Sequence, residues 1–273
     1  MADMQIASKR LSVTKLDGGQ FIRTEADIIT ERELALYVNG TRLATASMVP
    51  DLEKEFAAGY LFGQGFINSA DDIASIKIEN GTARVMLKND LISPAASYRI
   101  VSGGGRSAYF KDAKISKIKA NITISKQDIF KAMNTLFEKA ILYKETEGAH
   151  AAGLFNAKVE PICIVEDIGR HNTLDKLCGY CLLKSIHTSK TFLVSTGRMA
   201  SEMVTKICRA GIPIAATKTA VTDKGLEIAD RYSLTLIGFV RDTGNRINTD
   251  MDVRVIGDAG MKIYCNSARV RCE

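Results

Sequence analysis

The sequence predicts an α/β protein in which a layered α/β domain follows a smaller α+β domain. From residue 125 onward, helical and strand patterns alternate, which is typical of layered α/β domains with several parallel strands. Before that point, two Asn-Gly pairs each divide a segment of alternating hydrophobicity, a strong signal for a β-hairpin. With 46% hydrophobic and 25% charged residues, the composition excludes a disordered, collagenous or coiled-coil chain. We assign residues 1–120 to the smaller domain and residues 121–273 to the larger one.

The smaller domain is expected to hold two hairpins and one helix. Residues 34–43 and 76–87 each alternate around an Asn-Gly pair. Residues 51–62 repeat apolar side chains at helical spacing after a proline, which predicts a helix. The long stretch around residues 103–105 has three glycines and weak periodicity, and a loop of that length is usually either functional or disordered.

The larger domain is expected to alternate helices with strands along its whole length. Ser125 and Asp128 have the spacing of a helix cap, so a helix is predicted from Ser125 to about Lys144. Gly211 is placed to end another helix, and Pro213 opens the strand after it. The predicted strands are 149–155, 161–165, 191–195, 213–217 and 234–240, and the other predicted helices are 172–185, 198–210 and 223–232.

Charge and cysteine content limit the classes of function. A formal net charge of +6 favours an anionic partner such as a phosphate-bearing ligand, and it does not require nucleic acid. No apolar run approaches the ~18–20 residues of a membrane span, and residues 1–10 lack the apolar segment of a secretory signal. The six cysteines are scattered, as reduced thiols are. We expect a cytoplasmic protein that binds neither nucleic acid nor membranes.

Polar residues gather where three of the predicted strands end. Ligands of open α/β sheets bind at the carboxyl ends of strands, where small residues and helix starts offer backbone amides to an anion. Each junction is also compatible with a capped, salt-bridged turn, and none matches a Walker loop or a dinucleotide-binding motif. The candidate residues are Arg170 and His171 at the first junction, Ser195, Gly197 and Arg198 at the second, and Phe239, Val240, Arg241, Asp242, Thr243 and Gly244 at the third.

One histidine and one cysteine pair are candidates for metal or redox chemistry. His150 lies two residues before Ala152, where a zinc deaminase has a glutamate, and no Pro-Cys-x-x-Cys follows, so we expect no zinc. His150 is then either a core histidine or a polar contact to a ligand. Cys178 and Cys181 lie well inside a predicted helix, which favours core packing, and a redox or sulfur enzyme acting through them is the alternative.

Several long segments together resemble the formate dehydrogenase accessory protein family, FdhD/NarQ. They are residues 36–40, 50–53, 59–62, 146–155, 166–176, 195–213 and 238–241, within a resemblance that spans residues 25–250. The resemblance implies a C-terminal domain similar to cytidine deaminase but without its zinc, in a cytoplasmic protein that is usually a homodimer. It also implies that sulfur passes from a cysteine desulfurase to a molybdenum bis(molybdopterin guanine dinucleotide) cofactor, which then goes to formate dehydrogenase. The family's cofactor-binding segment corresponds to residues 239–244.

The chain departs from the family at the loop that carries sulfur. Where the family has Cys-Gly-x-Cys, residues 101–108 read Val-Ser-Gly-Gly-Gly-Arg-Ser-Ala, so Gly104 and Ser107 occupy the two cysteine positions. A glycine cannot hold a persulfide, and a serine hydroxyl is not a sulfur carrier at neutral pH. The family's Ser-Ala-Pro-Thr is also changed, to Thr-Ala-Val-Thr at residues 219–222. The alternative to a sulfur carrier is therefore a non-catalytic chaperone or paralogue that binds the cofactor.

Overall fold

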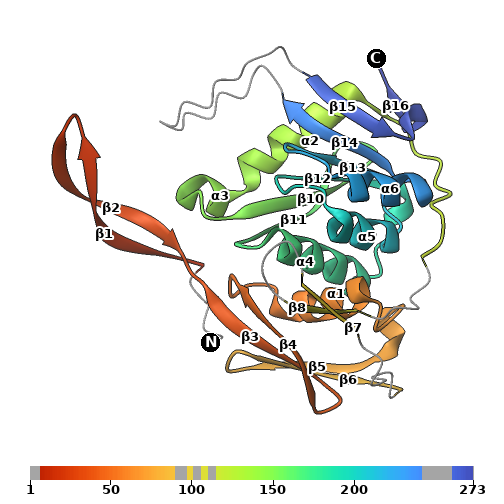
Figure 1. The fold of residues 1–273 in the computed structure, drawn as a ribbon, viewed down its shortest axis with the longest axis horizontal. Coiled ribbons are helices and arrows are strands. Elements are labelled where there is room, and N and C mark those ends of the chain that lie inside the picture. The colour runs from red at the N-terminus through yellow and green to blue at the C-terminus, as the bar shows by residue number, and fades with distance from the viewer. Residues whose placement is uncertain (1–6, 90–96, 101–105, 110–114, 242–259, 273) are drawn as a thin grey trace.

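The smaller of two main sheets is formed by the first part of the chain. The computed structural model describes residues 7–89, 97–100, 106–109, 115–241 and 260–272, and Figure 1 shows their arrangement. The Asn and Gly of each predicted turn have positive φ, at 45° and 82° in the first and 47° and 69° in the second, as tight hairpin turns require. Both predicted hairpins and the predicted helix are confirmed. The sheet has the order β4-β3-β6-β5, with β3 (Arg32–Val38), β4 (Thr41–Met48), β5 (Ile73–Glu79) and β6 (Thr82–Leu87), and it packs on α1 (Glu53–Gln64).

The larger sheet has the order β11-β10-β12-β13-β14-β15. Strands β12, β13 and β14 pair in parallel, while β10 is antiparallel to both of its neighbours and β15 is antiparallel to β14. The predicted alternation of strands and helices is confirmed, and the sheet is mixed rather than wholly parallel. The strands are β10 (His150–Asn156), β11 (Pro161–Asp167), β12 (Thr191–Ser195), β13 (Ile214–Thr217), β14 (Thr235–Arg241) and β15 (Gly260–Cys265).

Helices cover both faces of the larger sheet (Figure 1). On one face, α2 (Lys126–Lys139) and α3 (Ile141–Thr146) lie over a core that includes Phe155 and Phe192. The opposite face packs against α4 (Arg170–Leu183), α5 (Ser201–Arg209) and α6 (Asp223–Arg231), with Leu154 and Leu193 turned toward them. Successive residues of β10 and β12 therefore enter different cores, as the twofold alternation of a strand requires.

Two helix boundaries differ from the prediction because distant residues intervene. The helix expected to reach Lys144 breaks at Ala140, and the amides of Leu142 and Tyr143 at the start of α3 donate to the Glu166 carboxylate, at 3.2 and 2.7 Å. The helix expected from Arg198 begins only at Ser201, since the Met199 amide bonds to the Ala220 carbonyl at 3.0 Å and holds this segment extended. A short-range pattern contains neither contact.

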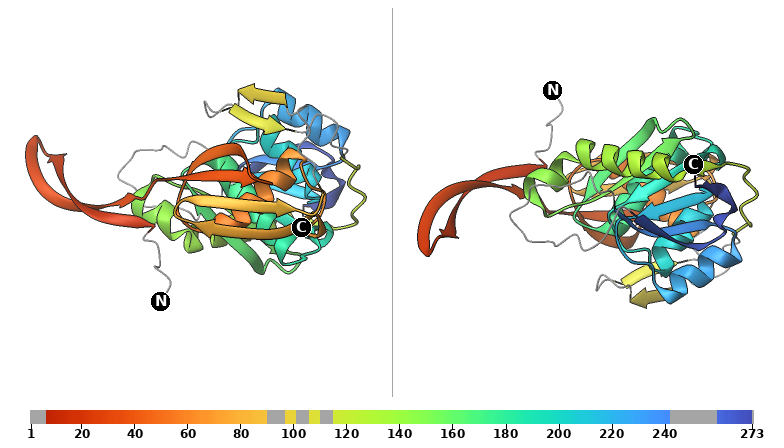
Figure 2. Two further views of the ribbon diagram at one scale, coloured as in Figure 1. Left: turned by 90° about the horizontal axis from the view of Figure 1, so that it is seen from below. Right: turned by 90° about the horizontal axis from the view of Figure 1, so that it is seen from above.

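The sequence analysis did not predict several of the strands. The longest are β1 (Ser8–Asp17) and β2 (Gln20–Ile29), an antiparallel hairpin that projects from the body in Figures 1 and 2. We call this hairpin the arm. The others are β7 (Ser97–Ile100), β8 (Arg106–Tyr109), β9 (Ile124–Ser125), β16 (Val270–Arg271) and β15.

The small sheet and the large sheet are joined by direct helix-to-helix contact. A β-carbon at Gly59 of α1 would stand 1.8 Å from the carbonyl oxygen of Asp175, and one at Gly179 of α4 would stand 1.8 Å from the carbonyl oxygen of Glu55. Only glycine allows the two backbones to approach so closely. The assignment of residues 1–120 and 121–273 to two domains stays a prediction. Among the helices that the structure describes, none is long and apolar enough to cross a membrane.

Candidate functional site

The three polar junctions lie along one edge of the large sheet. Because β10 is antiparallel to both β11 and β12, strand β11 runs in the same direction as β12, β13 and β14. The carboxyl ends of these four strands, together with the first residue of β10, therefore meet at a single edge, which we call the carboxyl edge. This is the arrangement that the sequence predicted for the junctions.

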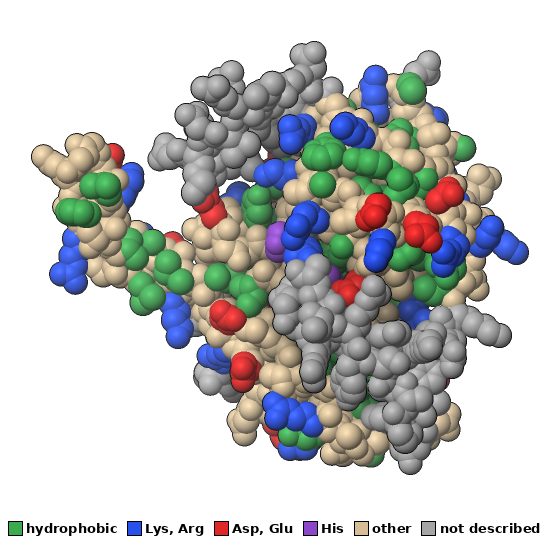
Figure 3. Space-filling model, in the orientation of Figure 1, with side chains coloured by type: hydrophobic (Ala, Val, Ile, Leu, Met, Phe, Trp, Pro, Cys, Tyr) green, Lys and Arg blue, Asp and Glu red, His purple; other side chains and the backbone are tan. Residues whose placement is uncertain are grey.

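The first two junctions bring cations and histidines together at this edge. Burial lowers the pKa of His150, and the nearby guanidinium groups of Arg170 and Arg198 lower it further, so the ring is neutral at pH 7. The pKa of Arg170 is itself lowered by burial and by Arg198, while Glu202 acts in the opposite direction. Two arginines from different strand ends thus influence one histidine. Figure 3 shows histidine side chains beside Lys and Arg side chains on this face.

His171 occupies the more enclosed side of the same cluster. Burial, with Lys206 and Arg170, lowers its pKa to about 3, and its Nε2 lies 3.4 Å from a carboxylate oxygen of Glu202. The side chains of His171 and Glu202 are 18% and 24% exposed. The imidazole is therefore a neutral polar group at pH 7, and it does not add to the positive charge of the two arginines.

Small and hydroxyl residues shape the backbone of the second junction. The Gly197 amide donates to the Ser195 hydroxyl at 3.1 Å, and the Thr217 hydroxyl donates to the Gly197 carbonyl at 2.7 Å. A β-carbon at Gly197 would stand 2.8 Å from the β-carbon of Arg170, so this glycine permits the two junctions to touch. Ser195 is fully buried, so its hydroxyl supports the turn and does not reach a ligand. Arg198 is the side chain of this junction that a ligand can contact.

The third junction presents an aromatic ring between two cations. Phe239 has a φ of 54°, which is uncommon for a bulky residue, and its amide bonds to the Thr219 carbonyl at 3.0 Å. The Arg241 guanidinium carbon lies 5.7 Å and the Lys262 ammonium 5.1 Å from the ring centre. Val240 is 2% exposed and belongs to the core, so its side chain is not available to a ligand. Asp242, Thr243 and Gly244 lie outside the described residues.

Threonines connect the junctions, and the sequence analysis did not identify them. The Thr196 hydroxyl lies 3.2 Å from Nδ1 of His150, and the Thr219 hydroxyl donates to the Thr196 carbonyl at 3.4 Å. Because Thr219 also binds the Phe239 amide through its carbonyl, one chain of contacts runs from His150 to Phe239. Thr219 opens the segment 219–222, which the sequence analysis interpreted only as an altered family motif, and Thr196 follows β12 with no signal beyond its position at a strand end.

Lys218, which directly follows β13, is a further cation at the carboxyl edge. Its ammonium group lies 3.1 Å from the Tyr143 hydroxyl and 5.0 Å from the ring centre of Phe137. Its charge has no carboxylate within 4.0 Å among the described residues. The sequence analysis missed Lys218 because nothing in the pattern of β13 distinguishes it from a solvated lysine.

The polar segment 166–176 divides into a ligand-facing part and a structural part. Asp167 and Lys176 are fully buried and form an ion pair of 2.7 Å. The same aspartate accepts from the Val49 amide at 3.1 Å, and the lysine donates to the Val49 carbonyl at 3.2 Å. Asn172 adds a bond of 2.8 Å to the Ser47 carbonyl. These residues fasten the small sheet to the large one, which leaves Arg170 and His171 of this segment at the cluster.

The cysteines lie apart from the cluster. Cys178 and Cys181 are 3% and 4% exposed, and burial raises the pKa of both thiols, that of Cys181 to about 12. Their prediction as core residues is confirmed. Gly104 lies outside the described residues, and Ser107 lies in β8, opposite Arg99 of β7. Among the described residues, no three His, Cys, Asp or Glu side chains are grouped to hold a metal ion, and the absence of zinc stays a prediction.

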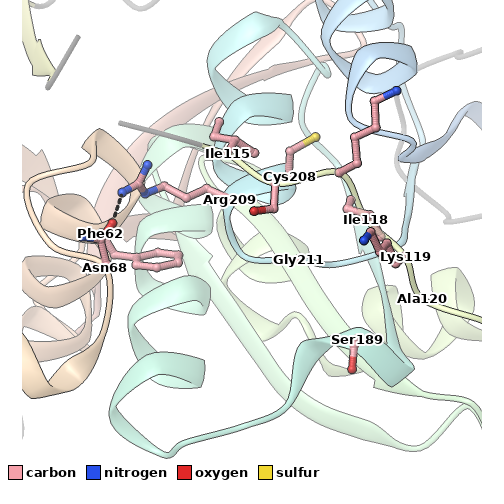
Figure 4. A pocket seen from close by; sticks show the side chains of 12 residues that line it. Phe62, Asn68, Ile115, Ile118, Lys119, Ala120, Ser189, Cys208, Arg209 and Gly211 are labelled. Carbon is pink, nitrogen blue, oxygen red and sulfur yellow. Dashed lines mark hydrogen bonds between the residues drawn. The ribbon is translucent and has the colours of Figure 1, made fainter. Parts of the chain in front are cut away.

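A separate hollow of about 340 Å³ lies at the end of α5 that is remote from Arg198 (Figure 4). Arg209 reaches across it to the Ile67 carbonyl and the Asn68 side-chain oxygen, at 3.2 and 3.1 Å, and its guanidinium carbon lies 5.5 Å from the ring centre of Phe62. These contacts bridge the two sheets. We therefore interpret this hollow as a seam between them.

The fold and its cationic edge define a class: a layered α/β protein with candidate anion-binding residues at the carboxyl ends of its strands. The family model for FdhD/NarQ matches residues 29–270, and the chain belongs to the FdhD/NarQ family.

Named relatives support the assignment. Sulfur carrier protein FdhD of Geobacillus kaustophilus is 33% identical over 260 residues, which cover 92% of this chain and 98% of the relative. The protein of that name from Bacillus pumilus is 35% identical over 241 residues, covering 85% and 91%. A crystal structure described as a formate dehydrogenase accessory protein, from Desulfotalea psychrophila, has a TM-score of 0.78 at 23% identity over 97% of this chain and all of that one, and this likeness concerns the fold.

Proposed function

We propose that this protein binds the molybdenum bis(molybdopterin guanine dinucleotide) cofactor at the carboxyl edge and delivers it to formate dehydrogenase. One observation supports this most directly: Arg170 and Arg198 come from different strand ends and lie close enough that one lowers the pKa of the other. Arg170 is half-buried and Arg198 is exposed. Two cations in mutual repulsion gain from an anion between them, and guanidinium groups bind phosphate oxygens in pairs. The cofactor is cargo, and its nucleotide phosphates are the groups that suit these arginines.

The other candidate residues fit a guanine nucleotide as well. The neutral ring of His150 offers a hydrogen bond without charge, and the Phe239 ring offers a surface for stacking a planar base. The strained φ of Phe239 supports a functional role, since such strain is found preferentially at binding sites. Arg241 and Lys262, which flank this ring, extend the positive charge toward residues 242–244.

Binding of GDP, which represents half of the cofactor's nucleotide portion, tests the proposal by calorimetry. Arg198→Ala and Arg241→Ala should each weaken GDP binding by about 1–3 kcal/mol, the range for a hydrogen bond to a charged group. Arg231→Ala is the matched control, because Arg231 is exposed on α6 and pairs with Glu227 one turn earlier. Unchanged affinity in both the Arg198 and Arg241 variants would place the nucleotide elsewhere.

Sulfur transfer is the activity that this chain is proposed to have lost. The thiolate of an acceptor cysteine attacks the outer sulfur of a donor persulfide, whose S–S bond breaks. The cysteine positions of the family loop hold Gly104 and Ser107, and burial raises the pKa of the Cys178 and Cys181 thiols. We propose a non-catalytic cofactor chaperone in the cytoplasm, which receives cofactor in a pathway that also contains a cysteine desulfurase. Its C-terminal layers would be those of a cytidine deaminase without zinc.

Mass spectrometry after incubation with a cysteine desulfurase and cysteine tests this loss. Wild-type protein should carry no persulfide, whereas the double change Gly104→Cys, Ser107→Cys should gain one in the loop. The double change Gly104→Ala, Ser107→Ala controls for altered loop conformation. Persulfide on wild-type Cys178 or Cys181 would instead show that these cysteines carry sulfur, and our assignment of them to the core alone would be wrong.

A further inference from the structure

The hollow beside Arg209 combines three cations with no acid. Of the 12 residues that line it, Lys117, Lys119 and Arg209 are cationic and none is Asp or Glu. Within the part of the chain that the structure describes, none of these three side chains has a carboxylate within 4.0 Å. The C-terminal end of α5, which borders the hollow, contributes only about half a unit of negative charge. The hollow therefore carries an uncompensated positive charge, which attracts an anion.

Arg209 is held in place by neutral groups and keeps one buried donor unused. Its guanidinium donates to the Ile67 carbonyl and the Asn68 side-chain oxygen, at 3.2 and 3.1 Å, and its carbon lies 5.5 Å from the ring centre of Phe62. Its Nε is buried and donates to no atom of the described residues. Burial lowers the pKa of Arg209, but a guanidinium stays charged at pH 7. Because a buried donor without an acceptor destabilises the fold, a ligand oxygen at Nε would be favourable.

The buried lining of the hollow is apolar, and one of its walls is fixed from behind. Ile118 and Cys208 are 7% and 2% exposed and belong to the core that packs against α5. The Ile118 amide donates to the Tyr232 carbonyl at 2.9 Å, and Arg269 donates to the Ile118 carbonyl at 3.3 Å, so the segment 115–120 is held against the body. Side chains from α1, α5 and this segment converge on the hollow (Figure 4). A preformed hollow that is apolar inside and has a few polar groups is typical of small-molecule sites.

We propose that this hollow binds a small phosphate monoester with an apolar body. A phosphate monoester carries about 1.5 to 2 negative charges at pH 7, which matches three cations better than the single charge of a carboxylate. Its oxygens accept from the Arg209 Nε and from the ammonium groups of Lys117 and Lys119. Its apolar body lies against Ile118 and Cys208. The volume of about 340 Å³ is near the lower end of the range for ligand pockets, about 300–1,000 Å³, so the ligand is small.

The position of the hollow separates it from the carboxyl edge. Arg209 is the last residue of α5, and Arg198 lies before its first residue, so a helix of 9 residues, about 14 Å long, stands between them. The ligand contacts both sides of the seam, because Phe62 packs in the core of the small sheet and Cys208 in that of the large sheet. Binding therefore holds the two sheets together. This inference does not depend on the proposed cofactor binding.

Calorimetric titration of the full chain with phenyl phosphate tests the proposal, with inorganic phosphate and benzoate as comparison ligands. Phenyl phosphate should bind at least about 10-fold more tightly than either, because inorganic phosphate lacks the apolar body and benzoate carries a single charge. Arg209→Met should weaken phenyl phosphate binding about 10-fold or more. The double change Lys117→Met, Lys119→Met should weaken it about 3- to 10-fold. Lys190→Met is the matched control, since this exposed cation follows Ser189 of the lining without being part of it, and affinity should be unchanged.

The lysine variant keeps the test decisive if the loss of Arg209, which also bridges the sheets, unfolds the protein. Lys117 and Lys119 are exposed, and far-UV circular dichroism reports the folding of every variant. Wild-type protein that binds no phenyl phosphate up to about 10 mM would overturn the proposal, as would wild-type affinity in the variants. Benzoate binding as tight as that of phenyl phosphate would overturn the choice of a phosphate.

A comparison with the Arg198→Ala variant distinguishes the hollow from the carboxyl edge. Phenyl phosphate affinity should be the same in Arg198→Ala and in wild type. Affinity that is lost in Arg198→Ala and retained in Arg209→Met would place the ligand at the carboxyl edge and overturn the proposal. GDP affinity, measured separately, should be unchanged in Arg209→Met, so that a failure of the nucleotide proposal is distinguished from a failure of this one.

Discussion

Replacing Gly179 by alanine tests how the two sheets are held together. A β-carbon at this position would stand 1.8 Å from the Glu55 carbonyl oxygen and 2.8 Å from the Gly59 amide nitrogen. A carbon and an oxygen approach favourably at about 3.3 Å, so α1 and α4 would have to separate by roughly 1.5 Å. The obstructing atoms are backbone atoms and cannot rotate away. We expect the substitution to force apart the whole contact between the helices.

The expected loss of stability is about 3 kcal/mol or more. Overpacking of a core costs about 1–3 kcal/mol, and the rigid backbone on both sides places this site at the upper end. Separation of the helices would also stretch the bond of 3.2 Å between Lys176 and the Val49 carbonyl, a charged hydrogen bond worth about 1.5–3 kcal/mol. The greater helix propensity of alanine returns only about 1 kcal/mol. For a chain of this size, Tm should fall by roughly 6–12 °C.

Urea denaturation followed by far-UV circular dichroism measures the effect, with Gly63→Ala as the matched control in α1. A β-carbon at Gly63 would meet side-chain atoms of Lys206 and Asp175 at 3.1 and 3.2 Å, and a shift of a few tenths of an ångström would relieve these contacts, so this variant should lose less stability than Gly179→Ala. The reasoning is refuted if Gly179→Ala unfolds at the urea concentration of the wild-type protein, since the two backbones would then not be in contact.

Two further predictions concern buried charge and pH. Lys176→Met leaves the fully buried Asp167 carboxylate without its cation and should lower the free energy of unfolding by about 3–5 kcal/mol in urea denaturation. Adding Asp167→Asn should restore part of that stability. A Lys176→Met variant as stable as wild type would contradict this prediction. The pKa of His171 is lowered to about 3, so below pH 6.5 the unfolded state binds a proton that the folded state does not. Stability should fall by roughly 1–2 kcal/mol from pH 7 to pH 5, and His171→Gln should flatten that slope; equal slopes in both proteins would refute the assignment.

The sequence by itself determined the elements whose signals are local. Both Asn-Gly hairpins, the cap at Ser125 and the positions of β10 to β14 in the large sheet follow from residues a few positions apart. The common edge of the three polar junctions was also predictable, because alternating strands and helices place strand ends together. The loss of cysteine at Gly104 and Ser107 could be seen only in the sequence, since Gly104 lies outside the described residues and Ser107 belongs to a strand whose side chains are not described.

Tertiary structure decided which polar residues face a ligand. In the sequence, Asp167 and Lys176 lie in the same polar segment as Arg170 and could belong to the same site. Their common partner is Val49, more than a hundred positions away, and this contact buries them in the structure instead. The threonines that link His150 to Phe239 and the extended conformation of Arg198 likewise depend on contacts between β12, β13 and β14. Local propensity carries no information about such distant partners, and the free energy of burying or pairing a charge depends on them.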